Sequence, residues 1–191
     1  MKAVGWHRKP YVHKYDNTIL LKGSDTMKEI FTRRSIRKYS NKPVEKEKLL
    51  RVLEAARLSP SAKNQQNWKF IVVQDGETRE RLTKAIGQSF VGEAPIILVC
   101  CGTEPESIMR CGQSRYTVDL SIATAYMILE AYEQGLGTCW LGSFDEGKVK
   151  EVLNIPEEVR VVSITPLGYP SESPSQRTRK TLDEIVSYDK Y

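Results

Sequence analysis

The sequence predicts a mixed α/β (α+β) fold in which helices flank a central mixed sheet. Segments with a helical spacing of apolar residues alternate with short apolar runs of strand length, after two helices at the start. One run, residues 94–101, is apolar throughout, as central strands are. A length of 191 residues and a hydrophobic content of 40% suit one domain with a packed core. We therefore expect one sandwich-like domain at residues 27–191, preceded by an N-terminal extension at residues 1–26.

Five helices are predicted before the C-terminal tail. The first begins with a capping-box pattern at residues 26–29, which places Ile30 and Phe31 on its inward face. The fourth has apolar residues on almost every side, so it must be enclosed in the core or in a subunit interface. After the first, the predicted helices cover residues 44–58, 78–86, 117–134 and 145–154.

Four strands are predicted between these helices. Each is rich in β-branched, aromatic or other apolar residues, and Asp75 and Gly76 supply the turn after the first. Gly135 and Gly137 end the long fourth helix before the third strand begins. The predicted strands cover residues 68–74, 94–101, 138–141 and 159–167.

The two ends of the chain differ from its middle. Residues 1–26 are aromatic and basic without a sustained period, and we interpret them as a substrate lid, a dimer clasp or a passive extension. Residues 168–191 carry prolines and a second capping-box pattern at residues 181–184. Because this tail is too patterned for a disordered end, we expect it to wrap over another surface, such as a second subunit.

Composition argues against a nucleic-acid or membrane protein. The net charge of +5 is spread along the chain, with acidic residues between the basic ones, as on an ordinary solvated surface. No apolar run approaches the ~20 residues of a membrane helix, and no secretory signal is recognisable. The four cysteines lack C-x-x-C spacing, which argues against a zinc or iron–sulfur site and suits a reducing compartment. The sequence thus predicts a cytoplasmic protein with no metal, no nucleic-acid partner and no membrane anchor.

Histidine is confined to the N-terminal extension. The two histidines are His7 and His13, so the main domain has no histidine base for a serine or cysteine nucleophile. If the protein is an enzyme, its difficult chemistry is therefore expected to come from a cofactor and not from a catalytic side chain.

Two polar segments stand out in the first third of the chain. Residues 33–37 (Arg-Arg-Ser-Ile-Arg) place arginines around a serine hydroxyl, a fork-shaped set of donors that suits a phosphate dianion. Residues 59–68 combine a turn with amide side chains, which suit the edge of a flat heterocycle. Together they indicate a nucleotide-like cofactor. The alternatives are surface arginines at a helix end and a plain loop before a strand.

Five motifs in this chain resemble, in the same order, those of the nitroreductase family of FMN-dependent oxidoreductases. They are Arg-Arg-Ser-Ile-Arg (33–37), Pro-Ser-Ala-x-Asn-x-Gln-x-Trp (60–68), Ala-Pro (94–95), Gly-Leu-Gly-Thr-Cys-Trp-Leu-Gly (135–142), and Leu-Gly-Tyr-Pro (167–170) followed by Arg177-Thr178-Arg179. The resemblance covers residues 27–188. One departure is Asn67, which stands where family members usually carry proline and loosens the turn while leaving the amide donors in place.

The resemblance implies an FMN phosphate site built from two distant segments. Arg33, Arg34 and Ser35 would hold the phosphate or the ribityl chain of the flavin. Arg177 and Arg179 would complete the site from the C-terminal tail. Because alternate residues of an extended segment point the same way, both of these arginines can address one anion.

The resemblance also implies which residues meet the flavin ring. Arg37 would reach the N1–C2 edge, where a positive charge stabilises the anionic reduced flavin. Leu141 and Gly142 would lay their backbone beside N5, with a backbone N–H offered to it, and glycine permits a close approach. The residues implied to contact the ring and the ribityl hydroxyls are Pro60, Ser61, Ala62, Asn64 and Gln66.

A homodimer with two FMN sites, each built at the interface from both chains, is a further implication of the resemblance. The helix at residues 117–134 would lie at the centre of that interface, with the C-terminal tail around the partner. NADH or NADPH would reduce FMN and leave before a nitroaromatic, a quinone or a similar flat small-molecule acceptor enters, in a ping-pong order. The alternatives are dehydrogenation or reductive dehalogenation on the same FMN, and a non-catalytic nucleotide- or nucleic-acid-binding protein.

Overall fold

The computed structural model describes residues 26–191, and the predicted N-terminal extension up to residue 25 lies outside the described residues. The α-helices are α1 (Lys28–Thr32), α2 (Lys46–Arg57), α3 (Gly76–Ile86), α4 (Arg115–Glu133), α5 (Glu146–Leu153) and α6 (Leu182–Ile185). Two short 3-10 helices are η2 (Ala62–Asn64) and η3 (Ser89–Glu93). The strands are β1 (Trp68–Val73), β2 (Ile96–Gly102), β3 (Gly137–Thr138) and β4 (Arg160–Gly168). Among the described residues, no helix is long and apolar enough to cross a membrane.

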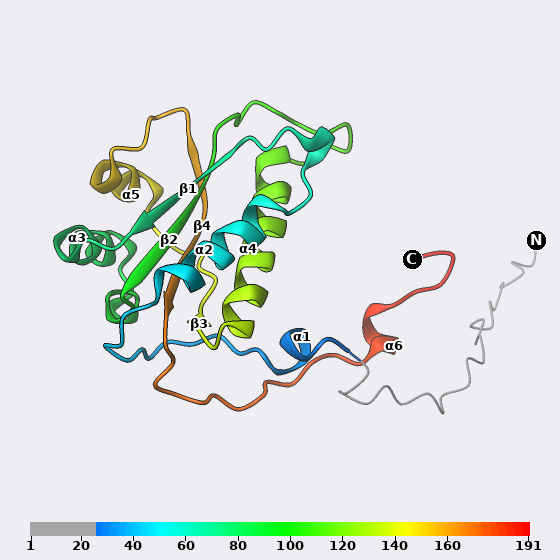
Figure 1. The fold of residues 1–191 in the computed structure, drawn as a ribbon. Coiled ribbons are helices and arrows are strands. Elements are labelled where there is room, and N and C mark those ends of the chain that lie inside the picture. The colour runs from blue at the N-terminus through cyan, green and yellow to red at the C-terminus, as the bar shows by residue number, and fades with distance from the viewer. Residues whose placement is uncertain (1–25) are drawn as a thin grey trace, which may run out of the picture.

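The four strands form one sheet in the order β1-β2-β4-β3, between two layers of helices (Figure 1). All neighbouring strands of this sheet run antiparallel, with Val99 of β2 opposite Ile71 of β1 and Ile164 of β4. The parallel component of the expected mixed sheet is confined, within residues 26–191, to a bridge between Ser35 and Thr138 at the β3 edge. The order of elements along the sequence predicts strands and crossing helices, but it does not say in which direction each strand enters the sheet.

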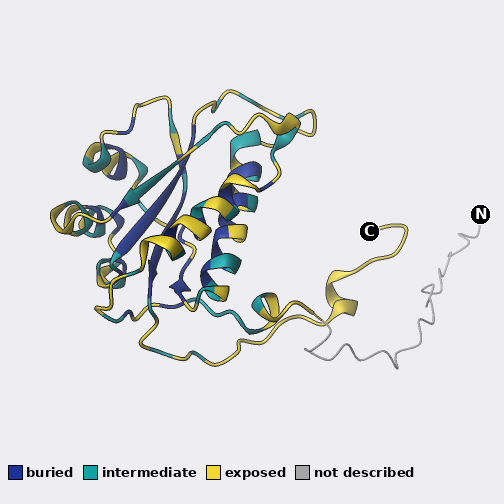
Figure 2. Cartoon of the chain, viewed as in Figure 1, coloured by how far each residue is buried: buried dark blue, intermediate teal, exposed yellow. Residues whose placement is uncertain are grey.

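Strand β2 divides the core into two parts. Its side chains alternate in direction, so Ile97 and Val99 face α3 and α5, whereas Ile96 and Leu98 face α2 and α4. Every residue of β2 is buried, and the buried residues concentrate on the sheet and on the inward sides of the helices (Figure 2). Burial on both faces explains why this stretch of the sequence is apolar without interruption.

Helix α1 differs from its prediction in two ways. Its N-cap is Met27 and no side chain caps it, so the capping box predicted at Thr26 does not form. Ile30 and Phe31 are 52% and 43% exposed, so the prediction that they face inward is wrong for the single chain. The reason is position, because this five-residue helix lies outside the layers, near the C-terminal end of α4 (Figure 1). The second predicted capping box, between Thr181 and Glu184 at α6, is confirmed.

Within residues 26–191, helix α4 is enclosed on one side only. Leu120, Ala123 and Met127 are buried against β2, β4 and α2, but Tyr126 on the outer side is 43% exposed. The described part of the chain therefore buries the inner apolar face of this helix and leaves its outer face uncovered.

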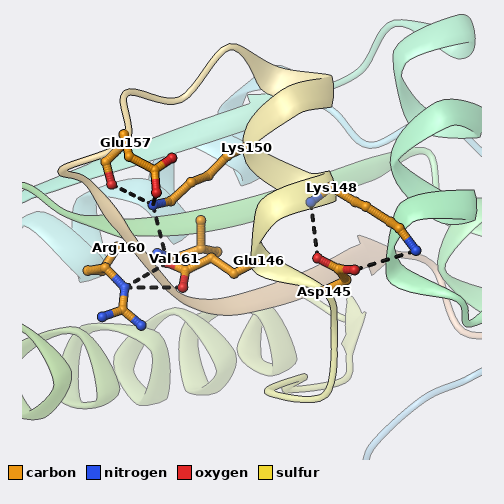
Figure 3. Close-up of polar contacts among 7 residues, drawn as sticks. All are labelled: Asp145, Glu146, Lys148, Lys150, Glu157, Arg160 and Val161. Atoms are coloured by element: carbon orange, nitrogen blue, oxygen red, sulfur yellow. Dashed lines mark hydrogen bonds and ion pairs between the residues drawn. The ribbon is translucent and has the colours of Figure 1, made fainter.

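Glu146 ties helix α5 to the start of β4 (Figure 3). Its carboxylate accepts hydrogen bonds from the backbone N–H of Val161 at 2.7 Å and from Arg160 Nε at 3.0 Å. Beside it, the nearly buried Lys150 donates from Nζ to the carbonyl oxygen of Glu157 at 2.6 Å. Burial alone would raise the pKa of Glu146, but the bonds from Arg160 and Val161 outweigh it and hold the pKa below its usual 4.5.

Replacing Glu146→Gln should lower the free energy of unfolding by about 1–2 kcal/mol at neutral pH, because the charged acceptor of two hydrogen bonds is lost. Since the folded-state pKa is lowered, this stabilisation is present above the unfolded pKa and disappears as the pH falls through the folded value. Urea unfolding at pH 7 and at successively lower pH measures both effects. Glu157→Gln is the control, because that side chain is 99% exposed and its change should stay within about 0.5 kcal/mol. If the loss of unfolding free energy in Glu146→Gln did not change with pH, the proposed role of the charge would be contradicted.

Candidate functional site

The arginine segment at residues 33–37 is an extension of the sheet and not a free loop. The backbone N–H of Ile36 donates to the carbonyl oxygen of Thr138 at 2.8 Å, next to the bridge between Ser35 and Thr138. The Ile36 side chain is buried over Gly137, where an added Cβ would lie 2.8 Å from Ile36 Cγ1. Glycine at this position therefore permits the close approach of the segment to β3.

Tyr39 fixes the other end of this segment. Its hydroxyl donates to the carbonyl oxygen of Ile36 at 2.7 Å, and its backbone pairs with Pro170. Burial raises the pKa of Tyr39, so the hydroxyl stays protonated and remains a donor. The segment is thus held on one side by β3 and on the other by the first residues of the C-terminal tail.

The two predicted halves of the phosphate site line one groove of about 870 Å³. Its lining includes every predicted phosphate-site residue together with the ring residue of the first segment: Arg33, Arg34, Ser35, Arg37, Arg177 and Arg179. The structure therefore brings residues more than 140 positions apart to the same place, although their roles toward a ligand stay predictions. Glu172 also lines the groove, and its Oε1 accepts from the backbone N–H of Arg37 at 2.5 Å.

The arginines of the groove differ in what already engages them. Arg34 Nη1 donates to the carbonyl oxygens of Phe31 at 3.0 Å and Arg33 at 2.8 Å, so this side chain closes the end of α1. The Arg37 guanidinium lies 5.8 Å from the centroid of the Phe90 ring, a cation–π distance. Among the described residues, the guanidinium groups of Arg33 and Arg177 have no hydrogen-bond or ion-pair partner within the chain. These two are the arginines best placed to bind an anion.

The backbone at Leu141 and Gly142 differs in part from its prediction. The N–H of Leu141 donates to the carbonyl oxygen of Ile164 at 2.9 Å, so this amide belongs to the sheet and cannot be offered to a ligand. The amide of Gly142 has no acceptor among residues 26–191 and is exposed. The Trp140 ring lies so close to Gly142 that an added Cβ would be 2.9 Å from it. Of the two predicted residues, Gly142 is the one with a free donor.

The second predicted segment forms a loop with unusual backbone angles. Lys63, Asn64 and Gln66 have φ values of 56°, 54° and 55°, a left-handed conformation that costs roughly 1–2 kcal/mol for a residue other than glycine. Ser61 stabilises the loop from within, since its Oγ accepts from the N–H of Gln66 at 3.1 Å. The Gln66 side chain donates to the carbonyl oxygen of Asn64 at 3.2 Å. The side chains of Asn64 and Gln66 are exposed, and Pro60 and Ala62 precede them in the loop.

Asp119 is a buried polar residue beside the candidate site that the sequence did not single out. It lies in α4, is only 6% exposed, and accepts from the backbone N–H of Ala62 with Oδ1 at 3.1 Å and Oδ2 at 3.2 Å. The available signal was a carboxylate inside a stretch of mostly apolar helix, which requires a donor when it is buried. No group of three or more histidine, cysteine or acidic side chains within the described part of the chain could hold a metal.

The two predicted segments lie at opposite ends of α4. The arginine segment shares a groove with Tyr132 and Glu133, whereas the loop is bonded to Asp119 (Figure 1). From Asp119 to Tyr132 the helix rises by about 20 Å. Neither groove that contains Arg33 includes a residue from 60 to 66. Within one chain, the two segments therefore do not form a shared site.

These features define a class of protein: a layered α+β domain with an arginine-lined groove at a sheet edge and an amide-bearing loop at the far end of its longest helix. Residues 30–96 and 83–169 match the sequence profile of the Nitroreductase family. A Methanothermobacter thermautotrophicus protein named NADH dehydrogenase/NAD(P)H nitroreductase is 38% identical over 168 residues, which cover 84% of this chain and 85% of that protein. The chain therefore belongs to the nitroreductase family of NAD(P)H-dependent oxidoreductases, which confirms the resemblance seen in the sequence.

Solved structures agree with this assignment. A nitroreductase family protein from Clostridium difficile 630 superposes with a TM-score of 0.78 at 32% identity, covering 87% of this chain and 99% of that one. An FMN-dependent nitroreductase from Clostridium difficile R20291 superposes with a TM-score of 0.71 at 32% identity, covering 83% of this chain and 96% of that one. The α+β fold predicted from the sequence is thus confirmed as the fold of this family.

The contact between Gly137 and Ile36 can be tested by mutation. Gly137→Ala should cost about 1–3 kcal/mol of unfolding free energy, because the added Cβ overlaps Ile36 and pushes the arginine segment off the sheet edge. Urea unfolding measures the loss, and faster tryptic cleavage after the segment's arginines would show where the chain has loosened. Gly76→Ala is the control, since nothing lies within 4 Å of the added Cβ. Equal effects of the two substitutions would contradict the tight-contact explanation.

Proposed function

We propose that this chain forms a homodimer that binds FMN at two equivalent sites and passes electrons from NADH or NADPH to a flat small-molecule acceptor. The separation of the arginine groove from the loop at residues 61–66 is the observation that supports this most. An isologous dimer in which two α4 helices pack antiparallel would place the loop of one copy beside the arginine groove of the other. Each site would then need both chains.

The uncovered face of α4 supports such a pairing. A groove of about 630 Å³ follows this face and is lined by Met27, Ile30, Tyr126 and Leu129, with glutamates at its rim. Leu58 of the neighbouring chain segment after α2 is also 63% exposed. An exposed groove with apolar lining is characteristic of a surface that another protein covers. The C-terminal tail, which extends away from the layers, is free to reach the partner (Figure 1).

The chemistry of the residues fits FMN. The guanidinium groups of Arg33 and Arg177, without partners among the described residues, suit a phosphate dianion. The exposed amides of Asn64 and Gln66 suit the polar edge of the ring and the ribityl hydroxyls. The unpaired N–H of Gly142 suits a ring nitrogen. Glu172 adds one negative charge to the groove, but the lining also carries five arginines and Lys180, so the net charge still favours an anion.

FMN, when bound, would supply the redox chemistry between NAD(P)H and the acceptor, and we propose a ping-pong order. The protein's own residues would bind and orient the ring, and Arg37 would place a positive charge near its reacting centre. No side-chain acid or base is needed for the first half-reaction, the reduction of FMN by NAD(P)H, in agreement with a sequence whose histidines, His7 and His13, both precede the domain. Nitroaromatics and quinones are the proposed acceptors, since they are flat enough to lie over a flavin ring.

The proposed function predicts a yellow protein. The purified full chain should have the mass of a dimer by light scattering and release close to one FMN per chain on denaturation. Under anaerobic conditions, NADH or NADPH should bleach the flavin absorbance, and a quinone or nitroaromatic should restore it. A colourless protein that cannot be reconstituted with FMN would refute the cofactor, and bound FMN that neither nicotinamide bleaches would refute the catalytic part.

Substitutions of Arg33 and Arg37 are expected to affect different properties, FMN binding and FMN reduction respectively. Arg33→Ala should weaken FMN binding by about tenfold or more, because it removes a charge-assisted bond to the phosphate. Arg37→Ala should slow the reduction of bound FMN more than it weakens FMN retention, because its charge acts on the reduced ring. Fluorescence titration and anaerobic stopped-flow absorbance measure the two quantities. Arg81→Ala, an exposed arginine on α3, controls for net charge. Equal losses of binding and reduction in Arg37→Ala would refute its separate role.

A further inference from the structure

The loop at residues 61–66 receives its capping bond from another element of the fold. The 3-10 helix η2 begins at Ala62, and its N-cap residue Ser61 makes no side-chain capping bond. Both carboxylate oxygens of Asp119, 57 positions further along the chain, instead lie 3.1 Å and 3.2 Å from the Ala62 nitrogen. The capping of this turn therefore depends on α4, and not on the loop itself.

This loop needs an external contact to keep its shape. Lys63, Asn64 and Gln66 have left-handed backbone angles. Residues with long side chains, such as Lys63 and Gln66, rarely adopt this conformation. Such a conformation persists only where the surrounding structure holds it. The internal bonds of the loop join Ser61, Asn64 and Gln66, which are all either exposed or only partly buried. Among the described residues, Asp119 is the nearly buried group that anchors the loop to the core.

Arg115 makes a second contact from the same side of α4. Its Nη1 donates to Oε1 of Gln65, and it lies four residues before Asp119, so the two side chains are neighbours on the helix surface. The first two turns of α4 therefore hold the loop at the backbone of Ala62 and at the side chain of Gln65.

The burial of the Asp119 carboxylate lowers the stability of the fold. A carboxylate that is only 6% exposed loses its hydration, and within residues 26–191 the N–H of Ala62 is the one donor that it bonds. Leu120 and Ala123 of the same helix belong to the apolar core. Arg115, on the face of Asp119, donates to Gln65. The bond that accounts for a buried aspartate at this position is therefore the one to the Ala62 amide of the loop.

We propose that Asp119 is a positioning residue that holds the loop at residues 61–66 in its left-handed shape, so that Asn64 and Gln66 are presented to the FMN of the site. This inference rests on the proposed FMN function. The carboxylate does not touch the flavin in this role. It acts through the Ala62 amide, so that in the proposed dimer one end of α4 supports the loop of one site and the other end supports the arginine groove of the second site.

The test compares Asp119→Leu and Asp119→Asn with the unaltered full-length protein. Asp119→Leu should raise the FMN dissociation constant by about tenfold to a hundredfold, the loss of one charge-assisted bond, without lowering the melting temperature of the FMN-free protein. Asp119→Asn keeps one carbonyl acceptor, so its FMN affinity should stay within about threefold of the original. Thr124→Val is the matched control: Thr124 is buried on the same helix and bonds Ser163, away from the loop. It should lower the melting temperature without changing FMN affinity.

Amide hydrogen exchange on the FMN-free protein gives a readout that does not depend on flavin binding. In Asp119→Leu the Ala62 amide should exchange about tenfold faster or more, while amides of β2 stay protected. If the unaltered protein binds no FMN, the proposed function fails, and this exchange result still decides whether Asp119 holds the loop. If FMN binds but its affinity is unchanged in Asp119→Leu, or falls equally in Asp119→Asn, the positioning role is overturned. Unchanged exchange of Ala62 would overturn it as well.

Discussion

Helix α4 carries apolar side chains on two opposite sides. The arrangement of the rest of the molecule depends on how these side chains are buried. Leu120, Ala123 and Met127 fill the core between α4, α2 and the sheet. Each large apolar side chain buried in this way contributes about 1.5–3 kcal/mol. The opposite face, with Tyr126 and Leu129, has no cover among residues 26–191. The same burial that fixes α4 on the sheet thus leaves an apolar surface, which the proposed dimer would cover.

The position of α4 also sets the geometry of the candidate site. Because it is a rigid rod packed on the sheet, it keeps the arginine segment near its C-terminal end and the loop at residues 61–66 near its N-terminal end. Neither segment can approach the other without unpacking the core. A site that uses both then requires a second copy, and the dimer and the cofactor become parts of one proposal.

The candidate ligand residues of the arginine segment are supported by secondary structure. Residues 33–39 lie between β3 and the start of the tail, with Ile36 packed on Gly137 and Tyr39 buried. Such support holds the backbone at Arg33 and Arg37 in place before any ligand binds, which reduces the entropy lost on binding. On the loop side, support comes from Asp119 and Arg115, which lie far from the loop in the sequence.

The sequence by itself determined most of the elements and the family, and it predicted the candidate ligand residues. Its apolar runs gave strands within a residue or two of β1, β2 and β4, because burial on a sheet demands such runs. It could not show that the Leu141 amide pairs with Ile164, or that Ile30 is exposed, because a pattern records which faces are apolar and not what covers them. Only the tertiary structure decided that Arg33 meets Arg177 in one groove, that Asp119 caps η2, and that the two segments stand at opposite ends of α4. Those facts depend on strand order and helix placement, and such long-range contacts leave no periodic trace in the sequence.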